Sequence, residues 1–383
     1  MSNPFDFDQI LNRQHSDSIK WQKYANQDVI PMWVADMDFA SPPSVVTALQ
    51  KRVAEQVYGY GHESTDVAEA FCDWYSRRYH WQIEPEWIVW LPGLVCGLHA
   101  VAKAFGSPDS ALMTHTPVYP PFLKLAERNQ QLLQAVPMLK PDQTGSGWQL
   151  DFDAMAQQIT PQTKLFMLCH PHNPTGRAFT REELEQLSDF CLEHKLLLCS
   201  DEIHCDLVLS EQAHIPMASL NEQIADRCIS LLAPSKTFNI AGLACSAAVI
   251  SNPILRKQFK RSIQGFMPEV NILGFVAAEA AYREGEPWLD ALREYLKENL
   301  TILTNWAKSK QQVKFTAPEA TYLGWLDLRA YEIERPAQWL LQETGVALSE
   351  GSDFGCPGFA RLNFGCPKAQ LLAALTRLDQ VLS

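Results

Sequence analysis

Long apolar stretches are missing from this chain of 383 residues. No run approaches the roughly 18 apolar residues that a membrane-spanning helix needs. The first residues, MSNPFDFDQILNR, are polar and charged, so we expect no secretory signal there. Positive charge is scarce too, with 32 Lys and Arg against 44 Asp and Glu and a net charge of −12. Because an acidic surface repels nucleic-acid phosphates and anionic lipid, we expect neither nucleic acid nor a membrane as a partner.

Closely spaced cysteine pairs are absent as well. The ten cysteines form no C-x-x-C pair, and most lie inside apolar runs such as LFMLC and LLLC. This pattern indicates buried free thiols, and neither a disulfide framework nor a zinc site. His170 and His172 flank a proline, but no further ligands lie at zinc spacing, so we expect no metal. Reduced thiols favour a cytoplasmic location.

The sequence does contain an alternation of strand-length apolar runs and helical patterns over about residues 45–284. The runs SALMTH, TKLFMLCH, KLLLCSDE, RCISLLAPS and LACSAAVIS each end at a turn or a polar cluster. Between two of them, Thr180 with Glu183 three residues later forms a capping box, which is typical of a helix start. Continuous apolar strands that alternate with helices predict an α/β fold with a mostly parallel sheet covered on both faces.

The pattern changes near residue 285. One long helical stretch, EGEPWLDALREYLKENLTILTNWAKSK, is followed by shorter strands and helices in TYLGWLDL, RPAQWLLQETG, ARLNFG and KAQLLAALTRLDQVL. We therefore predict a large domain over residues 45–284 and a smaller α+β domain over residues 285–383. Residues 1–44 are assigned, by fold analogy, to a segment that joins the small domain.

Four of the apolar runs are followed by a chemically distinctive side chain. Because ligands of open α/β sheets bind at the carboxyl ends of the strands, we expect these side chains to meet. They provide a ring, an amide, a carboxylate and an amine, from Tyr119, Asn173, Asp201 and Lys236. The set suits a pyridinium aldehyde cofactor. The amine can form a Schiff base, the carboxylate can keep the ring nitrogen protonated, the amide can donate to the ring oxygen, and the tyrosine can stack on the ring.

A phosphate on such a cofactor would need backbone donors. In LPGLVCGLHAVAKAF, a Pro-Gly turn opens a helix whose first N–H groups have no helical partner. The amides of Leu94 and Val95 are the candidates. Each candidate type also has an ordinary alternative, since surface-loop lysines, helix-capping aspartates, turn asparagines and core tyrosines are common at such positions.

Several motifs resemble those of a known superfamily. NPTG, SDEIH and SKTFNIAGL resemble fold-type I pyridoxal-phosphate enzymes of the class I/II aminotransferase superfamily, and the resemblance covers nearly the whole chain. More narrowly, PMWVADMDF, YGYGHES, TPVYPPF, CHPHNPTGRAF, SDEIHCDLV, APSKTFNIAGL and ATYLGWLDLR resemble the cystathionine β-lyase branch, the MalY/PatB type of carbon–sulfur lyase. The resemblance implies an aspartate-aminotransferase-like fold and pyridoxal 5′-phosphate as cofactor.

The resemblance assigns the four strand-end residues the roles that their chemistry suggests. It also implies that Arg361, in ARLNFG, grips the substrate carboxylate, with Arg329 in a comparable strand as the competing candidate. Ala35 and Asp36, in PMWVADMDF, are assigned to the substrate site. Tyr60, in YGYGHES, would reach the cofactor phosphate of a neighbouring subunit, so the resemblance implies a homodimer.

The chain also departs from typical aminotransferases. They carry a tyrosine three residues after the aspartate that pairs with the ring nitrogen, where this chain has His204. We count His204 among the cofactor contacts, with an ordinary core histidine as the alternative. They also carry a serine and an arginine where this chain has Ala233 and Ala244, so the phosphate contacts must differ. Ser235 and Thr237 are expected to supply hydroxyl donors instead.

The resemblance implies a pyridoxal-phosphate-dependent carbon–sulfur β-lyase. Such an enzyme cleaves cystathionine or related S-substituted cysteines to a thiol, pyruvate and ammonia. An aminotransferase shares every step up to the substrate carbanion and is the first alternative. A cofactor-binding regulator without turnover is the second, disfavoured because regulators of this fold carry a basic DNA-binding domain and this chain is acidic.

Overall fold

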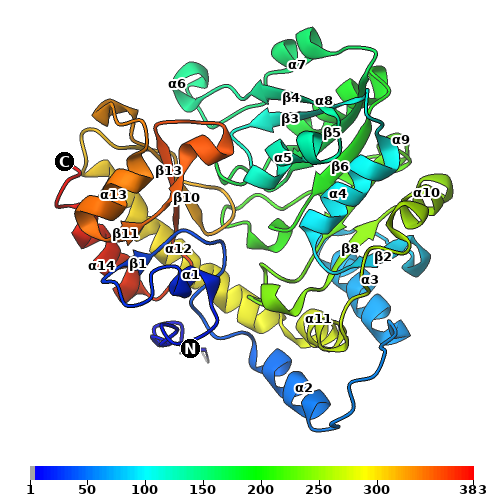
Figure 1. Ribbon diagram of the computed structural model, residues 1–383, viewed down its shortest axis with the longest axis horizontal. Coiled ribbons are helices and arrows are strands. Elements are labelled where there is room, and N and C mark those ends of the chain that lie inside the picture. The colour runs from blue at the N-terminus through cyan, green and yellow to red at the C-terminus, as the bar shows by residue number, and fades with distance from the viewer. Residues whose placement is uncertain (1–4) are drawn as a thin grey trace.

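The computed structural model, which describes residues 5–383, has a seven-stranded sheet at its centre (Figure 1). Its strand order is β2-β8-β7-β6-β5-β3-β4. These strands are β2 (Ile88–Leu91), β3 (Ala111–Thr116), β4 (Leu132–Pro137), β5 (Thr163–Cys169), β6 (Leu197–Asp201), β7 (Cys228–Leu232) and β8 (Ser246–Val249). Strand β8 is antiparallel to both of its neighbours, β2 and β7, and the other neighbouring pairs are parallel. The expected α/β fold with a mostly parallel sheet is confirmed.

Helices cover both faces of this sheet. They are α3 (Thr65–Tyr79), α4 (Leu94–Phe105), α5 (Pro120–Arg128), α6 (Pro141–Thr144), α7 (Phe152–Gln158), α8 (Arg181–Glu193), α9 (Glu222–Ala225), α10 (Pro253–Ile263) and α11 (Ile272–Glu284). Because successive strand side chains point to opposite faces, Leu165 and Met167 of β5 pack in one cluster with α4, α5 and α10. Phe166 and Leu168 pack in another cluster with α7, α8 and α9.

The C-terminal part begins with the long helix α12 (Glu286–Lys308), which matches the predicted helical stretch. A second sheet has the order β12-β13-β10-β9. Its strands and the helices beside it are β9 (Lys314–Phe315), β10 (Leu323–Asp327), α13 (Pro336–Thr344), β12 (Ser349–Glu350), β13 (Phe359–Asn363) and α14 (Lys368–Leu378). Short 3-10 helices complete the chain: η1 (Pro85–Trp87), η2 (Cys205–Leu207), η3 (Met217–Ser219), η4 (Ala241–Leu243), η5 (Arg329–Tyr331) and η6 (Gly351–Phe354).

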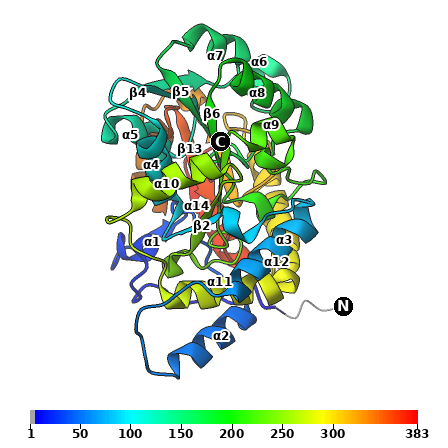
Figure 2. The ribbon, with the colours of Figure 1, turned by 90° about the vertical axis from the view of Figure 1, so that its right-hand side faces the viewer.

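The N-terminal segment lies against the C-terminal part, although the two are far apart in the sequence (Figures 1 and 2). It contains α1 (Ile19–Gln22) and β1 (Ile30–Pro31), and β1 pairs in parallel with β11 (Val346–Ala347). Residues 33–39, which we name the crossing segment, then lead toward α2 (Pro43–Val53). The division into domains at residues 44 and 284 stays a prediction.

Two further observations bear on the sequence predictions. All ten cysteines are free; eight are buried as expected, but Cys72 is half-buried and Cys96 is exposed at the start of α4. Over residues 5–383, the helices are all too short or too polar to cross a membrane.

Candidate active site

Polar side chains gather where the parallel strands of the central sheet end. Asp201 is the last residue of β6, and Lys236 follows β7 by four residues. Asn173 follows β5, and Tyr119 caps the N-terminus of α5 just after β3. The charges of Asp201 and Arg361 both act on Lys236 and on Tyr119, which places these groups around one space. The structure thus brings the four predicted strand-end residues together.

The amine of Lys236 is partly buried and hydrogen-bonded to the crossing segment. Its Nζ donates a hydrogen bond of 2.6 Å to the main-chain carbonyl of Ala35. Burial lowers the pKa of Lys236, Asp36 and Asp201 oppose the decrease and the Arg361 charge adds to it, and the net pKa is about 8. Near neutral pH, a useful fraction of this amine is therefore uncharged. A neutral amine can act as a nucleophile or as a base.

The carboxyl group of Asp201 lacks a strong partner within the chain. Among residues 5–383, the one hydrogen bond to its side chain comes from the backbone N–H of Ile203, at 3.2 Å. Burial raises the pKa of Asp201 to about 7, and the nearby Glu202 adds to the rise. A cationic ligand group beside this carboxyl would favour its ionised form. Asp201 is therefore suited to bind a protonated ring nitrogen.

Arg361, in β13, is buried beside Asn173. Its Nη1 donates to Oδ1 of Asn173 at 2.9 Å, and its Nη2 donates to the carbonyl of Trp33 at 2.8 Å and to Oγ of Ser349 at 3.2 Å. Burial lowers the pKa of Arg361 to about 10, and its buried Nε has no partner in the described chain. Because the carbonyl end of the Asn173 amide faces Arg361, its NH₂ end is left to donate to a ligand oxygen.

The competing arginine lies elsewhere. Arg329 is exposed and pairs with Asp327 at 2.7 Å, and with Asp142 at 3.4 Å. Hydrogen bonds to these two aspartates, together with their charges, raise the pKa of Arg329. The geometry therefore favours Arg361 as the carboxylate-binding residue.

His204 is buried at the start of η2, with its Nδ1 unpartnered among the described residues. Its ring centre lies 6.1 Å from that of Tyr322, whose hydroxyl donates to the Ala35 carbonyl at 2.9 Å. Burial lowers the pKa of His204 to about 3, and the Lys236 charge lowers it further. The imidazole is thus neutral at physiological pH. It lies close enough to the site to contact a ligand, as the sequence predicts, although its role stays a prediction.

The candidate phosphate-binding residues lie at the N-terminus of α4 and in the loop after β7. Leu94 and Val95 are the first residues of α4, which begins after Gly93 without a side-chain cap. The part-buried Ser235 keeps its hydroxyl free of hydrogen bonds to the rest of residues 5–383. The hydroxyl of Thr237 donates to the buried carboxylate of Asp206 at 2.8 Å. A hydroxyl has one proton to donate, so donation from the Thr237 side chain to a phosphate would have to replace this hydrogen bond, and the role of Thr237 stays a prediction.

The crossing segment is held by residues whose roles the sequence did not reveal. Asn239, three residues after Lys236, accepts from the N–H of Met37 at 3.0 Å and donates to its carbonyl at 3.0 Å. Asn363, two residues after Arg361, donates to the carbonyl of Asp36 at 2.7 Å. Both asparagines lie inside quoted motifs, SKTFNIAGL and ARLNFG. The motifs draw attention to both residues, but their hydrogen bonds to the crossing segment are seen only in the folded chain.

The unpaired groups of this site fit pyridoxal phosphate. The buried carboxyl of Asp201 needs a cation, the NH₂ end of Asn173 needs an acceptor, and the first amides of α4 suit an anion. The amine of Lys236 can condense with an aldehyde. A group with a ring nitrogen, a ring oxygen, an aldehyde and a phosphate satisfies all four requirements.

Comparisons with known proteins agree with this chemistry. The family model for aminotransferase class I and II matches residues 27–378. The chain is 38% identical to cystathionine beta-lyase PatB of Bacillus subtilis, over 98% of this chain and 100% of that protein. A crystal structure of OvoB is similar with a TM-score of 0.96 and 43% identity, covering 99% of both chains. The PLP-bound C-S lyase from Staphylococcus hominis gives a TM-score of 0.92 and 33% identity, covering 99% of this chain and 98% of that one.

Proposed function

The chain belongs to the aminotransferase class I and II family, and we propose that it breaks the Cβ–S bond of S-substituted cysteines such as cystathionine. Similarity along the whole chain to a cystathionine beta-lyase and to a PLP-bound C-S lyase identifies it as a pyridoxal-phosphate-dependent carbon–sulfur β-lyase. The products would be a thiol, pyruvate and ammonia. The observation that carries the proposal is the half-buried Lys236 amine, on which the charges of Asp201 and Arg361 both act.

Pyridoxal phosphate, when bound, supplies an electron-withdrawing ring that makes loss of the substrate α-proton and departure of a β-thiolate feasible. The chain's own residues would hold it. Asp201 would bind the ring nitrogen, the NH₂ end of Asn173 the ring oxygen, and Tyr119 one face of the ring. The amides of Leu94 and Val95, with the hydroxyl of Ser235, would bind the phosphate.

Arg361 would hold the substrate carboxylate. Guanidinium groups bind carboxylates through paired N–H donors, and a buried arginine does so with little competition from water. Its orientation is fixed by Asn173, the Trp33 carbonyl and Ser349, at 2.8–3.2 Å. The proposed substrate residues Ala35 and Asp36 follow Trp33, whose carbonyl binds this arginine, along the crossing segment. The Ala35 carbonyl is already occupied by Lys236 and Tyr322, which suggests a holding role for that carbonyl.

Lys236 would move the proton of the reaction. As a neutral amine, its Nζ accepts the proton from the substrate α-carbon, and as an ammonium it donates a hydrogen bond to the Ala35 carbonyl. Loss of a thiolate from Cβ leaves an enamine, which water hydrolyses to pyruvate and ammonia. A pKa near the operating pH suits both halves of this proton transfer.

Turnover of cystathionine without a keto acid separates the lyase from an aminotransferase. We expect the purified protein with pyridoxal phosphate to form pyruvate continuously from cystathionine alone, because elimination needs no amino acceptor. A coupled lactate dehydrogenase assay follows the pyruvate. Alanine is the control, because it has no leaving group on Cβ and should give none. Pyruvate that appears only after a keto acid is added would contradict the lyase assignment.

Tyr60 is proposed to act across a homodimer. Within one chain its side chain is fully exposed, and Val57 and Tyr58 nearby are 69% and 57% exposed. Apolar side chains gathered on a surface often mark an interface. We expect a dimer by analytical ultracentrifugation, and we expect Tyr60→Phe to weaken cofactor binding about tenfold through loss of one hydrogen bond to an anion. Tyr58→Phe is the matched control and should bind the cofactor normally; a monomer that binds pyridoxal phosphate fully would contradict the role of Tyr60.

A further inference from the structure

The crossing segment touches both principal residues of the proposed site through main-chain carbonyls. The carbonyl of Trp33 accepts from Arg361 at 2.8 Å, and the carbonyl of Ala35 accepts from Lys236 at 2.6 Å. These carbonyls are two residues apart on one short stretch of chain. A displacement of this stretch would therefore disturb the substrate-binding arginine and the amine together.

The segment has no regular secondary structure of its own, so other elements must hold it. Asn363 binds the carbonyl of Asp36, and Asn239 binds the main chain of Met37, as described above. These contacts come from strand β13, which carries Arg361, and from the loop that carries Lys236. They tie the segment to the site but do not fix it relative to the N-terminal part of the chain.

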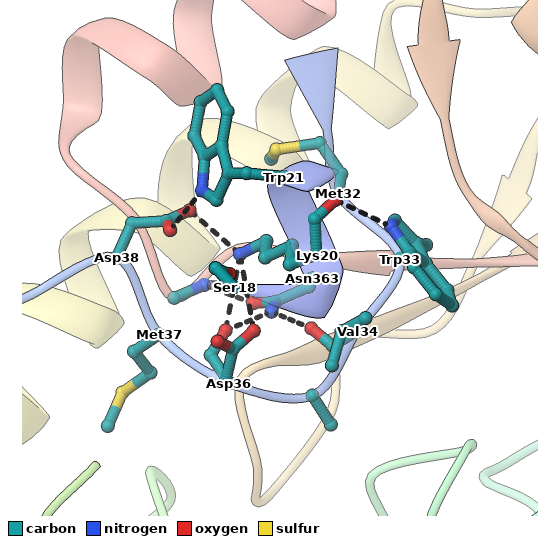
Figure 3. A network of polar contacts seen from close by, with 12 residues as sticks. Ser18, Lys20, Trp21, Met32, Trp33, Val34, Asp36, Met37, Asp38 and Asn363 are labelled. Carbon is teal, nitrogen blue, oxygen red and sulfur yellow. Dashed lines mark hydrogen bonds and ion pairs between the residues drawn. The ribbon is translucent and has the colours of Figure 1, made fainter. Parts of the chain in front are cut away.

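A buried ion pair supplies that second attachment (Figure 3). The Nζ of Lys20, in α1, lies 2.7 Å from Oδ2 of Asp38, and both side chains are almost fully buried. The same Nζ donates to the main-chain carbonyl of Asp36 at 3.2 Å. Lys20 therefore binds the crossing segment at two points, the side chain of Asp38 and the main-chain carbonyl of Asp36, which follows Ala35.

Further donors surround the Asp38 carboxylate. Arg13 binds its Oδ1 at 2.7 Å, the indole N–H of Trp21 binds the same oxygen at 2.9 Å, and Gln370 of α14 binds Oδ2 at 3.0 Å. Burial opposes ionisation of this carboxyl, but the Lys20 charge and these hydrogen bonds outweigh it and lower the pKa of Asp38. The carboxylate thus joins α1, α14 and the crossing segment in one fully bonded network.

A buried ion pair is weak support for stability, because removing two charges from water costs about as much as their attraction returns. Its contribution is to geometry. If the crossing segment moved, the two charges would separate and remain buried without a partner, so other positions of the segment are unfavourable. We propose that Lys20 and Asp38 are positioning residues for the active site, which fix the crossing segment so that its Trp33 and Ala35 carbonyls hold Arg361 and Lys236. The inference rests on the proposed role of Lys236.

The test measures the Lys236 amine directly in the cofactor-free, full-length chain. Acetic anhydride acylates neutral amines, and peptide mass spectrometry gives the extent of labelling at Lys236 as a function of pH. The native chain should give a midpoint near pH 8. In Lys20→Met the crossing segment loses its anchor and water reaches the amine. Since burial is the main cause of the low pKa of Lys236, hydration should raise this pKa, and the labelling midpoint should rise by about one pH unit.

Two further variants separate positioning from general loss of stability. Lys20→Arg keeps the charge and should leave the midpoint within about a quarter of a pH unit of the native value. Met155→Ala opens a cavity in α7, at the upper end of the molecule in both ribbon views and away from α1 (Figures 1 and 2). It should lower the melting temperature without moving the midpoint.

The outcomes are distinct even if one variant is poorly folded. Arg13→Gln removes only the part-exposed outer cation of the network and should raise the midpoint by a smaller amount in a well-folded chain. An unchanged or lowered midpoint in folded Lys20→Met and Arg13→Gln would overturn the inference. So would an equal shift in Met155→Ala. Because the labelling needs neither cofactor nor substrate, these results do not depend on whether the lyase reaction is found.

Discussion

Replacement of Lys236 by alanine should abolish both turnover and covalent attachment of the cofactor. We expect pyruvate formation from cystathionine to fall by at least about 10⁴-fold, since no other amine of this site can serve as nucleophile and base. The visible absorbance of a lysine–pyridoxal phosphate imine should disappear from the purified protein. The fold should persist, because the only hydrogen bond of the Lys236 amine in the described chain is to the Ala35 carbonyl. Absorbance spectra, circular dichroism and the coupled pyruvate assay measure the three effects.

A second variant at the same site serves as the matched control. Arg361→Lys should keep the cofactor absorbance, because Arg361 is proposed to bind the substrate and not the cofactor. It should weaken cystathionine binding by about 100-fold, because one ammonium cannot replace a fork of donors. Borohydride reduction of the native protein, followed by peptide mass analysis, should place the cofactor on Lys236. A tag on another lysine, or full activity in Lys236→Ala, would remove the basis of the mechanism.

Much of this site could be predicted because local patterns and topology act together. The capping box at Thr180 and Glu183 forms as expected, with bonds of 3.3 and 2.8 Å, and starts α8. The alternation of apolar runs with such helices gives a parallel sheet. In a parallel sheet, strand ends that are distant in sequence share one edge. Asn173, Asp201 and Lys236 were therefore expected to meet, and they do.

The rest of the site depends on contacts that sequence periodicity does not encode. The crossing segment lies more than 300 residues from Asn363 in the sequence, yet the two are hydrogen-bonded. Likewise, no local pattern shows that Asp206 accepts a hydrogen bond from the hydroxyl of Thr237, or that the indole of Trp74 donates to the same carboxylate at 3.1 Å. Short polar side chains can bond in many directions, so their partners follow from the packed fold. The exposed position of Tyr60 in one chain is a similar case, because its proposed partner belongs to another molecule.

Asparagine in place of Asp201 should have opposite effects on the cofactor-free and cofactor-bound protein. In the free chain, burial raises the pKa of Asp201 to about 7 from an ordinary value near 3.8. The stability that this group contributes is therefore complete below about pH 4 and is lost as the pH rises to about 7. The amide that replaces the carboxyl would carry no charge to desolvate. We expect cofactor-free Asp201→Asn to be more stable than the native chain at pH 8 by about 2 kcal/mol, measured by urea unfolding.

With pyridoxal phosphate bound, the same substitution should be harmful. The neutral amide cannot keep the ring nitrogen protonated, so the ring withdraws electrons less strongly. We expect turnover to fall by about 10²- to 10³-fold and cofactor affinity to fall as well. Glu202→Gln is the sharpest control, because Glu202 is the adjacent buried carboxyl and burial also raises its pKa to about 7. It bonds to His214 at 2.8 Å and to the N–H of Met217 at 3.1 Å, groups outside the proposed cofactor site.

The pair of variants thus separates a ligand-binding carboxyl from a structural one. Glu202→Gln should leave cofactor affinity near the native value, because the partners of Glu202, His214 and Met217, lie outside the proposed cofactor site. Asp201→Asn should raise stability and lower affinity, a combination that no purely structural role produces. If Asp201→Asn destabilises the cofactor-free chain at pH 8, its carboxyl already has a strong partner within the protein. The proposed pairing with the ring nitrogen would then be wrong, even if turnover is lost.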